Sequence, residues 1–520
     1  MQQKAFSYSY ILTLLLLSVI LLFPSLGKMQ LWIYDEVRNA ECAREMWERS
    51  DWIVPTFNGE LRALKPPLHY YFMFGGFELF GMNEWGARFF SSVFGVLTVL
   101  ITFLFTARHS SLLHAFITGC VLLASTHFLF EFRMSVPDPY LIFFNVLSIF
   151  AGYSYFQEKK FKWLFVCAFA IGLGSLAKGP VAIALPAASL FFWLLWQKQL
   201  KDIFHWHIII AAIIVLIVAA PWYVAVHYAT NGEFTKGFFF THNFDRFAEP
   251  MEGHGGIFII VPVFVLLGLL PTTIFISESL RKFKERYKDP FLRLALCVTL
   301  VYVVFYSISG TKLPNYPMPC YPFAAIILSY FISLVISGKA RGRLYPFLIL
   351  LLINIALPVG LFFGIKNEVE LRGYEYHSAI LLILTLASLV SILILKMRGF
   401  KSAVISLMVF YFIFNIIFLN YLYPTLYRNN PLTKTIATVK QYDNVVAYKT
   451  FHPSFTFYLP KRVKVYDNPD SLNSFMEKSK ALVISRQSLT AEIDSLQLQQ
   501  VAAHHDLFEN HTTVLLTNKK

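Results

Sequence analysis

The chain has 520 residues, of which 56% are hydrophobic and only 15% are charged. A soluble protein of average composition carries about 25% charged residues, so this composition is that of a membrane protein. The net charge of +14 does not indicate nucleic-acid binding, because most lysines and arginines lie in short loops between apolar stretches, where they set membrane topology.

Apolar runs that match the thickness of a membrane follow one another along most of the chain. A bilayer core about 30 Å thick requires about 20 apolar residues per helix. On this basis we predict an all-α polytopic membrane protein with about 13 transmembrane helices. The predicted segments lie near residues 9–27, 88–106, 112–130, 137–155, 161–177, 179–196, 207–226, 257–277, 291–309, 315–336, 345–364, 377–395 and 402–420.

The first segment follows Lys4 and has the length of a signal peptide, but no A-x-A-like cleavage site follows it, so we expect a retained anchor. With a cytoplasmic N-terminus, the inside loops carry 19 Lys and Arg residues, against 7 in the outside loops between the long first loop and residue 420. This bias predicts a cytoplasmic N-terminus and, after thirteen spans, a periplasmic C-terminal region.

The first predicted outer loop, residues 28–87, contains Tyr34-Asp35-Glu36-Val37-Arg38. An ionisable group near the membrane is costly to bury unless it is paired or solvated, so each one is a candidate functional residue. Asp35 and Arg38 are three residues apart and are therefore neighbours on a helix. Such an acid can act as a general base on an acceptor hydroxyl or amine. The alternative is that these residues cap a surface helix.

Further along this loop, Gly59 and the pair Pro66-Pro67 predict a rigid turn that holds Lys65 at the membrane surface. Lys65 can bind a phosphate as a point charge. The alternative is a lysine that reaches to the interface beside the stretch 66–81, which is apolar but too short to span, and which we expect to be re-entrant or interfacial.

Asp138 lies between Pro137 and Pro139 at the start of a predicted span. A carboxylate in this place can cap the helix. A capping acid does not require so rigid a frame, and a functional role is equally consistent with the pattern.

Two lysines in outer hairpins run against the positive-inside trend. Lys178 lies in Ala177-Lys178-Gly179-Pro180, and Lys312 lies shortly before Tyr316 in the next such hairpin. Either lysine alone can meet lipid headgroups. Both together, on the side away from the usual positive charge, favour an anionic ligand.

The longest internal outer loop adds hydrogen-bond donors in an aromatic setting, namely His242, Arg246 and His254. A metal site formed by the two histidines matches no standard ligand spacing. We therefore predict that these three residues bind substrate and that the chain has no metal site.

The region 421–520 changes character after the last predicted span. Val463 and Val465 alternate with charged residues, and the runs Ala481–Ile484 and Thr512–Leu516 read as strands, with helices expected over 471–478 and 490–496. We predict a small periplasmic α/β domain after a transmembrane catalytic domain that comprises residues 1–420.

The polar residues together predict a cavity on the outer side of the membrane. It contains the carboxylates Asp35 and Asp138 and the cations Lys65, Lys178, Arg246 and Lys312. Carboxylates can activate an acceptor, and cations can hold a phosphate and stabilise its charge as it leaves. A lipid-linked sugar phosphate fits such a cavity because it arrives laterally from the bilayer. No Walker A or Rossmann fingerprint indicates a nucleotide.

Several motifs follow one another between about residues 10 and 330. They are Tyr34-Asp35-Glu36, Ala43-Arg44-Glu45-Met46, Asp51-Trp52, Asn58-Gly59, Lys65-Pro66-Pro67-Leu68, Asn83-Glu84, Ala87-Arg88, Leu176-Ala177-Lys178-Gly179-Pro180, Pro221-Trp222-Tyr223, His242-Asn243, Arg246-Phe247, Gly253-His254-Gly255-Gly256 and Ser309-Gly310-Thr311-Lys312-Leu313-Pro314. In this order they resemble the bacterial polyprenyl-phosphate-dependent GT-C glycosyltransferases, above all the lipid A aminoarabinose transferases and the related protein mannosyltransferases.

The resemblance implies that Asp35 is the base or acceptor-binding carboxylate of an inverting transfer and that Asp138 is the second acidic position. It also implies that Lys65, Lys178 and Arg246 hold the carrier phosphate of an undecaprenyl phosphate sugar. Relatives usually carry Asp or Glu just before the Lys-Pro-Pro, and that residue is linked to a metal in some members. This chain has Leu64 there, which argues against a divalent metal, and no other cofactor is implied.

Two other classes of function are compatible with many spans. A transporter or lipid flippase is expected to place charges near mid-membrane and to break helices in corresponding halves, whereas these charges gather at outer helix ends. A scaffold protein needs no acids facing a set of cations. We therefore predict an inner-membrane glycosyltransferase whose partners are the lipid-linked donor, a lipid, glycan or protein acceptor, and membrane lipids, with a transporter as the alternative.

Overall fold

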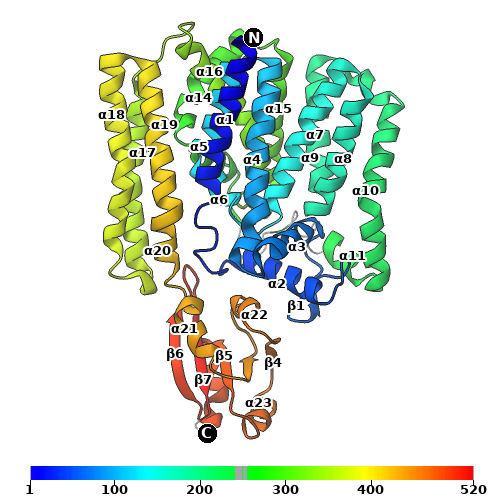
Figure 1. Ribbon diagram of the computed structural model, residues 1–520, viewed down its shortest axis with the longest axis vertical. Coiled ribbons are helices and arrows are strands. Elements are labelled where there is room, and N and C mark those ends of the chain that lie inside the picture. The colour runs from blue at the N-terminus through cyan, green and yellow to red at the C-terminus, as the bar shows by residue number, and fades with distance from the viewer. Residues whose placement is uncertain (1, 241–248, 250–254, 519–520) are drawn as a thin grey trace.

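The computed structural model consists of a bundle of long helices with a small sheet below one end of it (Figure 1). The structure describes residues 2–240, 249 and 255–518, and the side chains from residue 8 onward. The chain passes up and down through the bundle, and the C-terminal sheet lies on the side opposite the N-terminus (Figure 1).

Most helices of the bundle follow the predicted apolar segments. Their bounds are α1 (Gln2–Leu22), α4 (Glu84–His109), α5 (Leu112–Ala124), α6 (Thr126–Glu131), α7 (Asp138–Glu158), α8 (Phe161–Lys178), α9 (Val181–Gln197), α10 (His207–Ala229), α11 (Glu233–Lys236), α13 (Ile260–Gly268), α14 (Ile276–Glu285), α15 (Pro290–Ile308), α16 (Tyr321–Ile336), α17 (Tyr345–Asn367), α18 (Leu382–Arg398), α19 (Phe400–Ile417) and α20 (Tyr423–Tyr427).

Nine helices within the described residues are long and apolar enough to cross a membrane, and a bent pair of helices is a tenth candidate. Three shorter apolar helices, Tyr8–Leu22, α5 and α9, accompany them. The predicted all-α polytopic fold is confirmed, while the count of thirteen spans stays a prediction.

The predicted span 257–277 is not one straight helix. It is replaced by α13 and by Thr272–Glu285, which are bent by 108° relative to each other. The break lies at Pro271, which has no N–H to donate to the preceding turn. The sequence after it is also too polar to continue a span, since α14 carries Arg281, Lys282 and Lys284.

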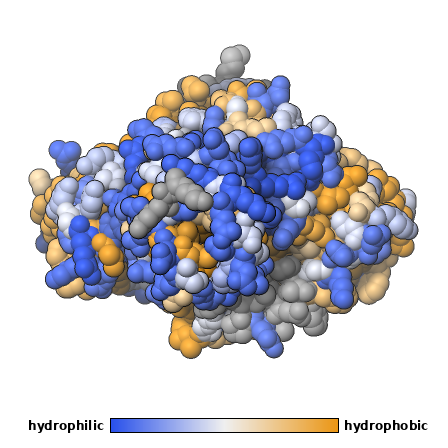
Figure 2. Space-filling model, turned by 90° about the horizontal axis from the view of Figure 1, so that it is seen from below, coloured by the Kyte–Doolittle hydropathy of each residue, from blue (hydrophilic) through white to orange (hydrophobic). Residues whose placement is uncertain are grey.

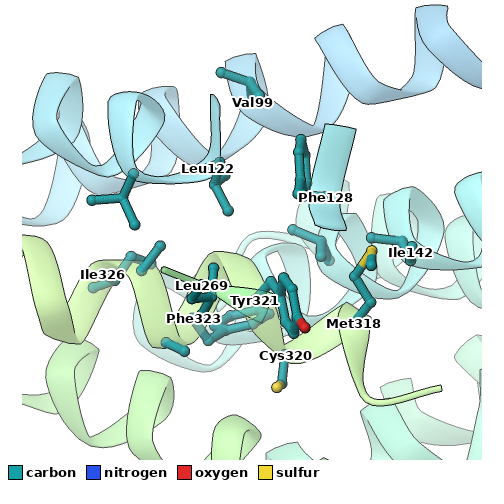
Figure 3. Packing of buried hydrophobic residues seen from close by; sticks show 14 of the residues in the cluster. Val99, Leu122, Phe128, Ile142, Leu269, Met318, Cys320, Tyr321, Phe323 and Ile326 are labelled. Atoms are coloured by element: carbon teal, nitrogen blue, oxygen red, sulfur yellow. The ribbon is translucent and has the colours of Figure 1, made fainter. Parts of the chain in front are cut away.

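Apolar side chains from helices far apart in the sequence form the core of the bundle (Figure 3). Val99 on α4, Leu122 on α5 and Tyr321 at the start of α16 are fully buried. Small polar groups also join these helices, because the hydroxyls of Thr118 and Ser329 lie 2.7 Å apart. Such hydrogen bonds replace the hydrophobic driving force that helices lack in lipid.

The long first loop folds against the end of the bundle that faces the sheet. It contains α2 (Tyr34–Glu48), the hairpin β1 (Thr56–Phe57) and β2 (Glu60–Leu61), and α3 (Leu68–Phe80). The short apolar stretch 66–81 thus forms α3, which is not among the candidate spans. Hydrophilic residues cover most of this end of the molecule around the C-terminal sheet (Figure 2).

The C-terminal region forms a five-stranded mixed sheet in the order β4-β3-β5-β7-β6. Its strands are β3 (Val445–Tyr448), β4 (Lys464–Tyr466), β5 (Leu482–Arg486), β6 (Gln499–His505) and β7 (Thr512–Thr517). The helices α21 (Pro431–Val439), α22 (Ser454–Tyr458) and α23 (Pro469–Met476) accompany the sheet. The predicted small α/β domain is confirmed as a fold, although β3 and β6 were not predicted and the boundary at residue 420 stays a prediction.

This sheet region docks on the first loop through polar contacts. Asn58 in the β1–β2 turn exchanges hydrogen bonds of 2.8 and 3.0 Å with the backbone of Val463. Arg44 on α2 donates to the carbonyl oxygens of Thr456 and Leu459 at 3.3 Å each. The C-terminal region is therefore joined directly to the helix that carries Asp35.

Asp506 in the sheet region predicts a pH-dependent stability. Burial raises the pKa of Asp506 to about 6, although its Oδ1 accepts a hydrogen bond of 2.6 Å from Thr513. The protonated form is therefore the stabilising one, and its contribution is lost as the pH rises through about 6. In thermal unfolding of the full chain in nanodiscs, the unfolding temperature of Asp506→Asn should therefore fall less than that of the wild type as the pH rises through about 6. Asp494→Asn changes an exposed carboxylate of the same region and should keep the wild-type pH dependence.

Candidate functional site

Asp35 and Glu36 lie in the first turn of α2, where a helix favours negative charge. Neighbouring positions on a helix point in different directions, and the two carboxylates have different surroundings: Asp35 is exposed, and Glu36 is 1% exposed. Asp35 is accessible to a substrate and lies within electrostatic range of Arg62 and Glu131.

Glu36 is held in a buried ion pair with Arg88 on α4. Arg88 donates from Nε to Oε1 at 2.6 Å and from Nη2 to Oε2 at 2.8 Å, and its Nη1 donates to the carbonyl oxygen of Leu26 at 2.6 Å. The backbone N–H of Ser135 donates a third hydrogen bond to the Glu36 carboxylate, at 3.0 Å from Oε1. These are the contacts of a structural residue, and a contact of Glu36 with substrate stays a prediction.

The hydrogen bond from Ser135 to Glu36 connects the first loop to the start of α7. Ser135 belongs to the segment between α6 and α7 that leads into Asp138, so Glu36 ties this segment to the first turn of α2. The two predicted acidic positions, which are about a hundred residues apart in the sequence, are thereby held at the same end of the bundle.

Asp138 is the first residue of α7 and is 5% exposed. Lys178, the last residue of α8, donates to its Oδ1 at 2.5 Å. The Lys178 ammonium also lies 4.5 Å from the centre of the Tyr316 ring. The structure thus brings together three of the predicted residues, an acid, a cation and an aromatic ring, from three separate parts of the chain.

Glu131 is a member of this cluster that the sequence analysis did not identify. It ends α6, is 6% exposed, and accepts a hydrogen bond of 3.3 Å from Asn315. It lies within electrostatic range of Asp35, Asp138 and Lys178. A carboxylate at the end of the apolar run 112–130 was the available signal, since charges at such places are costly unless they are used.

Buried polar groups line the side of α2 and α3 next to Asp35. Nδ2 of Asn39, Nε of Arg62 and both ring nitrogens of His69 have no hydrogen-bond partner among the described residues. Arg62 also donates to Asn39 Oδ1 at 2.9 Å, which places these groups side by side. A buried polar group without a partner costs about 1–3 kcal/mol. These groups therefore favour a polar ligand or water in this place.

His69 lies among cations. Burial together with the charges of Arg62 and Lys65 lowers the pKa of His69 well below its ordinary value, so the ring is neutral at physiological pH. A neutral imidazole has one donor and one acceptor nitrogen, which suits it to hydroxyl groups.

The remaining predicted residues are two lysines, Arg38, and three residues of the longest internal outer loop. Lys65 is 9% exposed and lies within electrostatic range of His69. Lys312 is half-buried and donates to the carbonyl oxygen of Ser309 at 2.6 Å. Arg38 packs over the ring of Tyr34 at 5.0 Å. His242, Arg246 and His254 lie outside the described residues.

Among the described residues, no group of three or more His, Cys, Asp or Glu side chains is arranged to hold a metal ion. Next to Lys65, where relatives carry an acid, this chain has the apolar Leu64. The absence of a metal site stays a prediction.

Known proteins share both the sequence pattern and the fold. The dolichyl-phosphate-mannose-protein mannosyltransferase family matches residues 7–231. An undecaprenyl phosphate-alpha-4-amino-4-deoxy-L-arabinose arabinosyl transferase of Shewanella sediminis is 29% identical over 388 residues, which cover 71% of this chain and 68% of the relative. An uncharacterized protein of Aquifex aeolicus is 29% identical over 66% of this chain and 68% of its own length.

The solved structure of ArnT from Cupriavidus metallidurans bound to undecaprenyl phosphate superposes with a TM-score of 0.81 at 20% identity, covering 98% of both chains. The chain is a membrane glycosyltransferase similar to enzymes that use undecaprenyl phosphate-linked donors. The fold extends to a more distant enzyme, since the oligosaccharyltransferase AglB of Archaeoglobus fulgidus has a TM-score of 0.52 at 13% identity over 94% of this chain and 70% of AglB.

The predicted class of enzyme and its setting in a membrane are therefore confirmed. This glycosyltransferase is a multi-pass inner-membrane protein. The transporter alternative is not supported, because the matching proteins of named activity are transferases.

Proposed function

We propose that this enzyme transfers a glycosyl group, with inversion, from an undecaprenyl phosphate sugar to an acceptor on the periplasmic side of the membrane. The acceptor is a lipid A, another glycolipid, a glycan or a protein. The cluster in which Lys178 pairs with Asp138 at 2.5 Å, close to Glu131 and the exposed Asp35, is the observation that carries the proposal.

The proposed topology places the N-terminus in the cytoplasm and both the active site and the C-terminal region in the periplasm. The distribution of Lys and Arg supports this arrangement. The region 1–420 is then the catalytic domain, and 421–520 is a periplasmic domain that docks on the first loop.

In the proposed reaction the Asp35 carboxylate accepts the proton from the acceptor hydroxyl or amine. The acceptor atom forms a bond to the anomeric carbon of the sugar while the bond from this carbon to the phosphate oxygen breaks. The undecaprenyl phosphate leaves with the electron pair of that bond and its additional negative charge. Inversion follows from a single displacement on the face opposite the leaving group.

Cations near the leaving phosphate stabilise the charge that develops on it. Lys178 is the described cation whose place is best defined, because Asp138 orients its ammonium and the Tyr316 ring packs against it. We assign the same role to Lys65, which is buried and lies within electrostatic range of His69, and to Arg246.

The unpartnered groups of Asn39, Arg62 and His69 are proposed to contact the hydroxyl or amino groups of the transferred sugar. Arg62 and His69 lie within electrostatic range of Asp35, where the reacting carbon has to be, and Asn39 accepts a hydrogen bond from Arg62. A sugar offers both donors and acceptors to such groups. Satisfying such groups gives strong discrimination, because a sugar without the matching group leaves them unpaired.

The direct test is turnover of a lipid-linked donor by the purified enzyme in nanodiscs. A panel of undecaprenyl phosphate sugars is supplied with lipid A and peptide acceptors, and mass spectrometry follows both the donor and the product. Consumption of one donor with release of undecaprenyl phosphate is the expected result. No consumption of any donor, by an enzyme that thermal unfolding shows to be folded, would contradict the proposal.

Removal of the Lys178 ammonium should weaken donor binding and slow departure of the phosphate. A hydrogen bond to a charged group contributes about 1.5–3 kcal/mol, so Lys178→Met should lower kcat/KM for the donor by about 10- to 100-fold. Steady-state kinetics with varied donor measure the effect. Lys236→Met, at an exposed lysine that ends α11, is the matched control and should change kcat/KM less than twofold.

A further inference from the structure

A polar cavity lies at the end of the bundle opposite the candidate active site. It has a volume of about 470 Å³ and is formed by the α4–α5 connection, the segment between α14 and α15, and the end of α16. Arg88 and His109 on α4 mark the two ends, and the helical rise of 1.5 Å per residue separates them by about 30 Å. The cavity is therefore distinct from the site of glycosyl transfer.

Two cations from different parts of the chain meet at this cavity. Arg286 follows α14, and Lys339 follows α16, and both side chains line the cavity and are exposed. Neither side chain has an ion-pair partner within the portion of the chain that the structure describes. The one carboxylate in the lining, Asp289, is already engaged, because its Oδ1 accepts from the N–H groups of Phe291 and Leu292 at 2.9 and 3.1 Å.

Other polar groups complete this wall. Ser333 and Ser337 line the cavity, and their hydroxyls donate to the carbonyl oxygens of Tyr330 and Ser333 at 2.7 and 2.8 Å. His109 also lines it, and its Nε2 is buried and lacks a hydrogen-bond partner among the described side chains and backbone. The imidazole is held in place by its ring contact with Phe291, at 5.2 Å between ring centres. Two cations beside an imidazole nitrogen without a partner are groups that can bind phosphate oxygens.

The other wall is apolar. Leu113, Leu292 and Leu334 line the same cavity beside the polar groups. An apolar wall does not contribute to the binding of a free phosphate. The glycerol and first acyl carbons of a phospholipid can pack against it. The place of the cavity, where several membrane-crossing helices end, also matches the depth of a headgroup.

We propose that this cavity binds the phosphate group of an anionic phospholipid, in the leaflet opposite the candidate active site. The bound lipid joins the α4–α5 connection to the α14–α15 segment and to the end of α16, and so stabilises the bent α13–α14 region against the rest of the bundle. This site is independent of the proposed transfer reaction.

The test uses the full chain, purified and placed in nanodiscs of phosphatidylcholine with or without phosphatidylglycerol. Native mass spectrometry counts the phosphatidylglycerol molecules that remain bound after release, and thermal unfolding measures the stabilisation. The double variant Arg286→Ala/Lys339→Ala removes both cations. The matched control is Lys284→Ala/Arg341→Ala. It removes two exposed cations that do not line the cavity, one from the last turn of α14 and one from the loop after α16.

Phosphatidylglycerol should raise the unfolding temperature of the wild type and of the control variant, and the double variant should bind it at least about tenfold more weakly. Stabilisation by inorganic phosphate in pure phosphatidylcholine nanodiscs, lost in the double variant, would assign the same phosphate site to a soluble ligand. Equal retention of phosphatidylglycerol by the double variant and the control would overturn the proposal.

Discussion

Asp35→Asn should lower kcat/KM for the acceptor by about 10²- to 10⁴-fold while the protein remains folded, because general-base catalysis contributes this much. The amide has nearly the shape of the carboxylate but cannot accept the proton of the acceptor. Stability should hardly change, because Asp35 is exposed and no packing is lost. Donor affinity should also be retained, since Lys65 and Lys178 are unchanged.

The measurement combines steady-state rates with thermal unfolding and donor binding on the same preparation. Glu48→Gln is the matched control, because Glu48 ends the same helix with its side chain 51% exposed. This control should retain the wild-type rate. Near-normal turnover by Asp35→Asn would show that another group takes the proton, and Glu131 would then be the next carboxylate to replace.

The sequence could predict the membrane fold because the bilayer imposes a simple rule on it. Each apolar segment must satisfy its backbone hydrogen bonds internally, so a run of suitable length becomes a helix. The rule fails where other forces act. Pro271 and the polar α14 bend the segment 257–277, and Ser125 separates α5 from α6 by capping the latter through the N–H of Phe128.

The sequence could predict which residues belong to the candidate site, but not which of them form ion pairs with one another. Asp138 and Lys178 stood out because each breaks an apolar pattern, yet nothing in their spacing predicts that they form an ion pair. Asp35 and Glu36 look equivalent in the sequence, and only the register of α2 against α4 makes one exposed and the other a buried partner of Arg88. Glu131 directly follows the predicted apolar segment 112–130, and its spacing from Asp138 in the sequence does not show that the two carboxylates lie close together.

The buried pair of Glu36 and Arg88 should be the largest single contributor to the stability of the candidate site. Removing one partner of a buried ion pair costs about 3–5 kcal/mol, because the remaining charge has no compensation. In Arg88→Met the Glu36 carboxylate keeps only the Ser135 N–H, and the carbonyl oxygen of Leu26 loses its donor. We therefore expect this variant to unfold at a much lower temperature.

Activity should fall together with stability in Arg88→Met, because Glu36 fixes the turn of α2 that carries Asp35. The double variant Glu36→Gln/Arg88→Met leaves no charge buried and should recover part of the lost stability. Arg108→Met tests the same helix at an exposed pair, since Arg108 and Glu158 are 44% and 19% exposed, and it should cost no more than about 1 kcal/mol. Equal destabilisation by Arg88→Met and Arg108→Met, measured by unfolding in nanodiscs, would mean that the buried pair does not hold the first loop on the bundle.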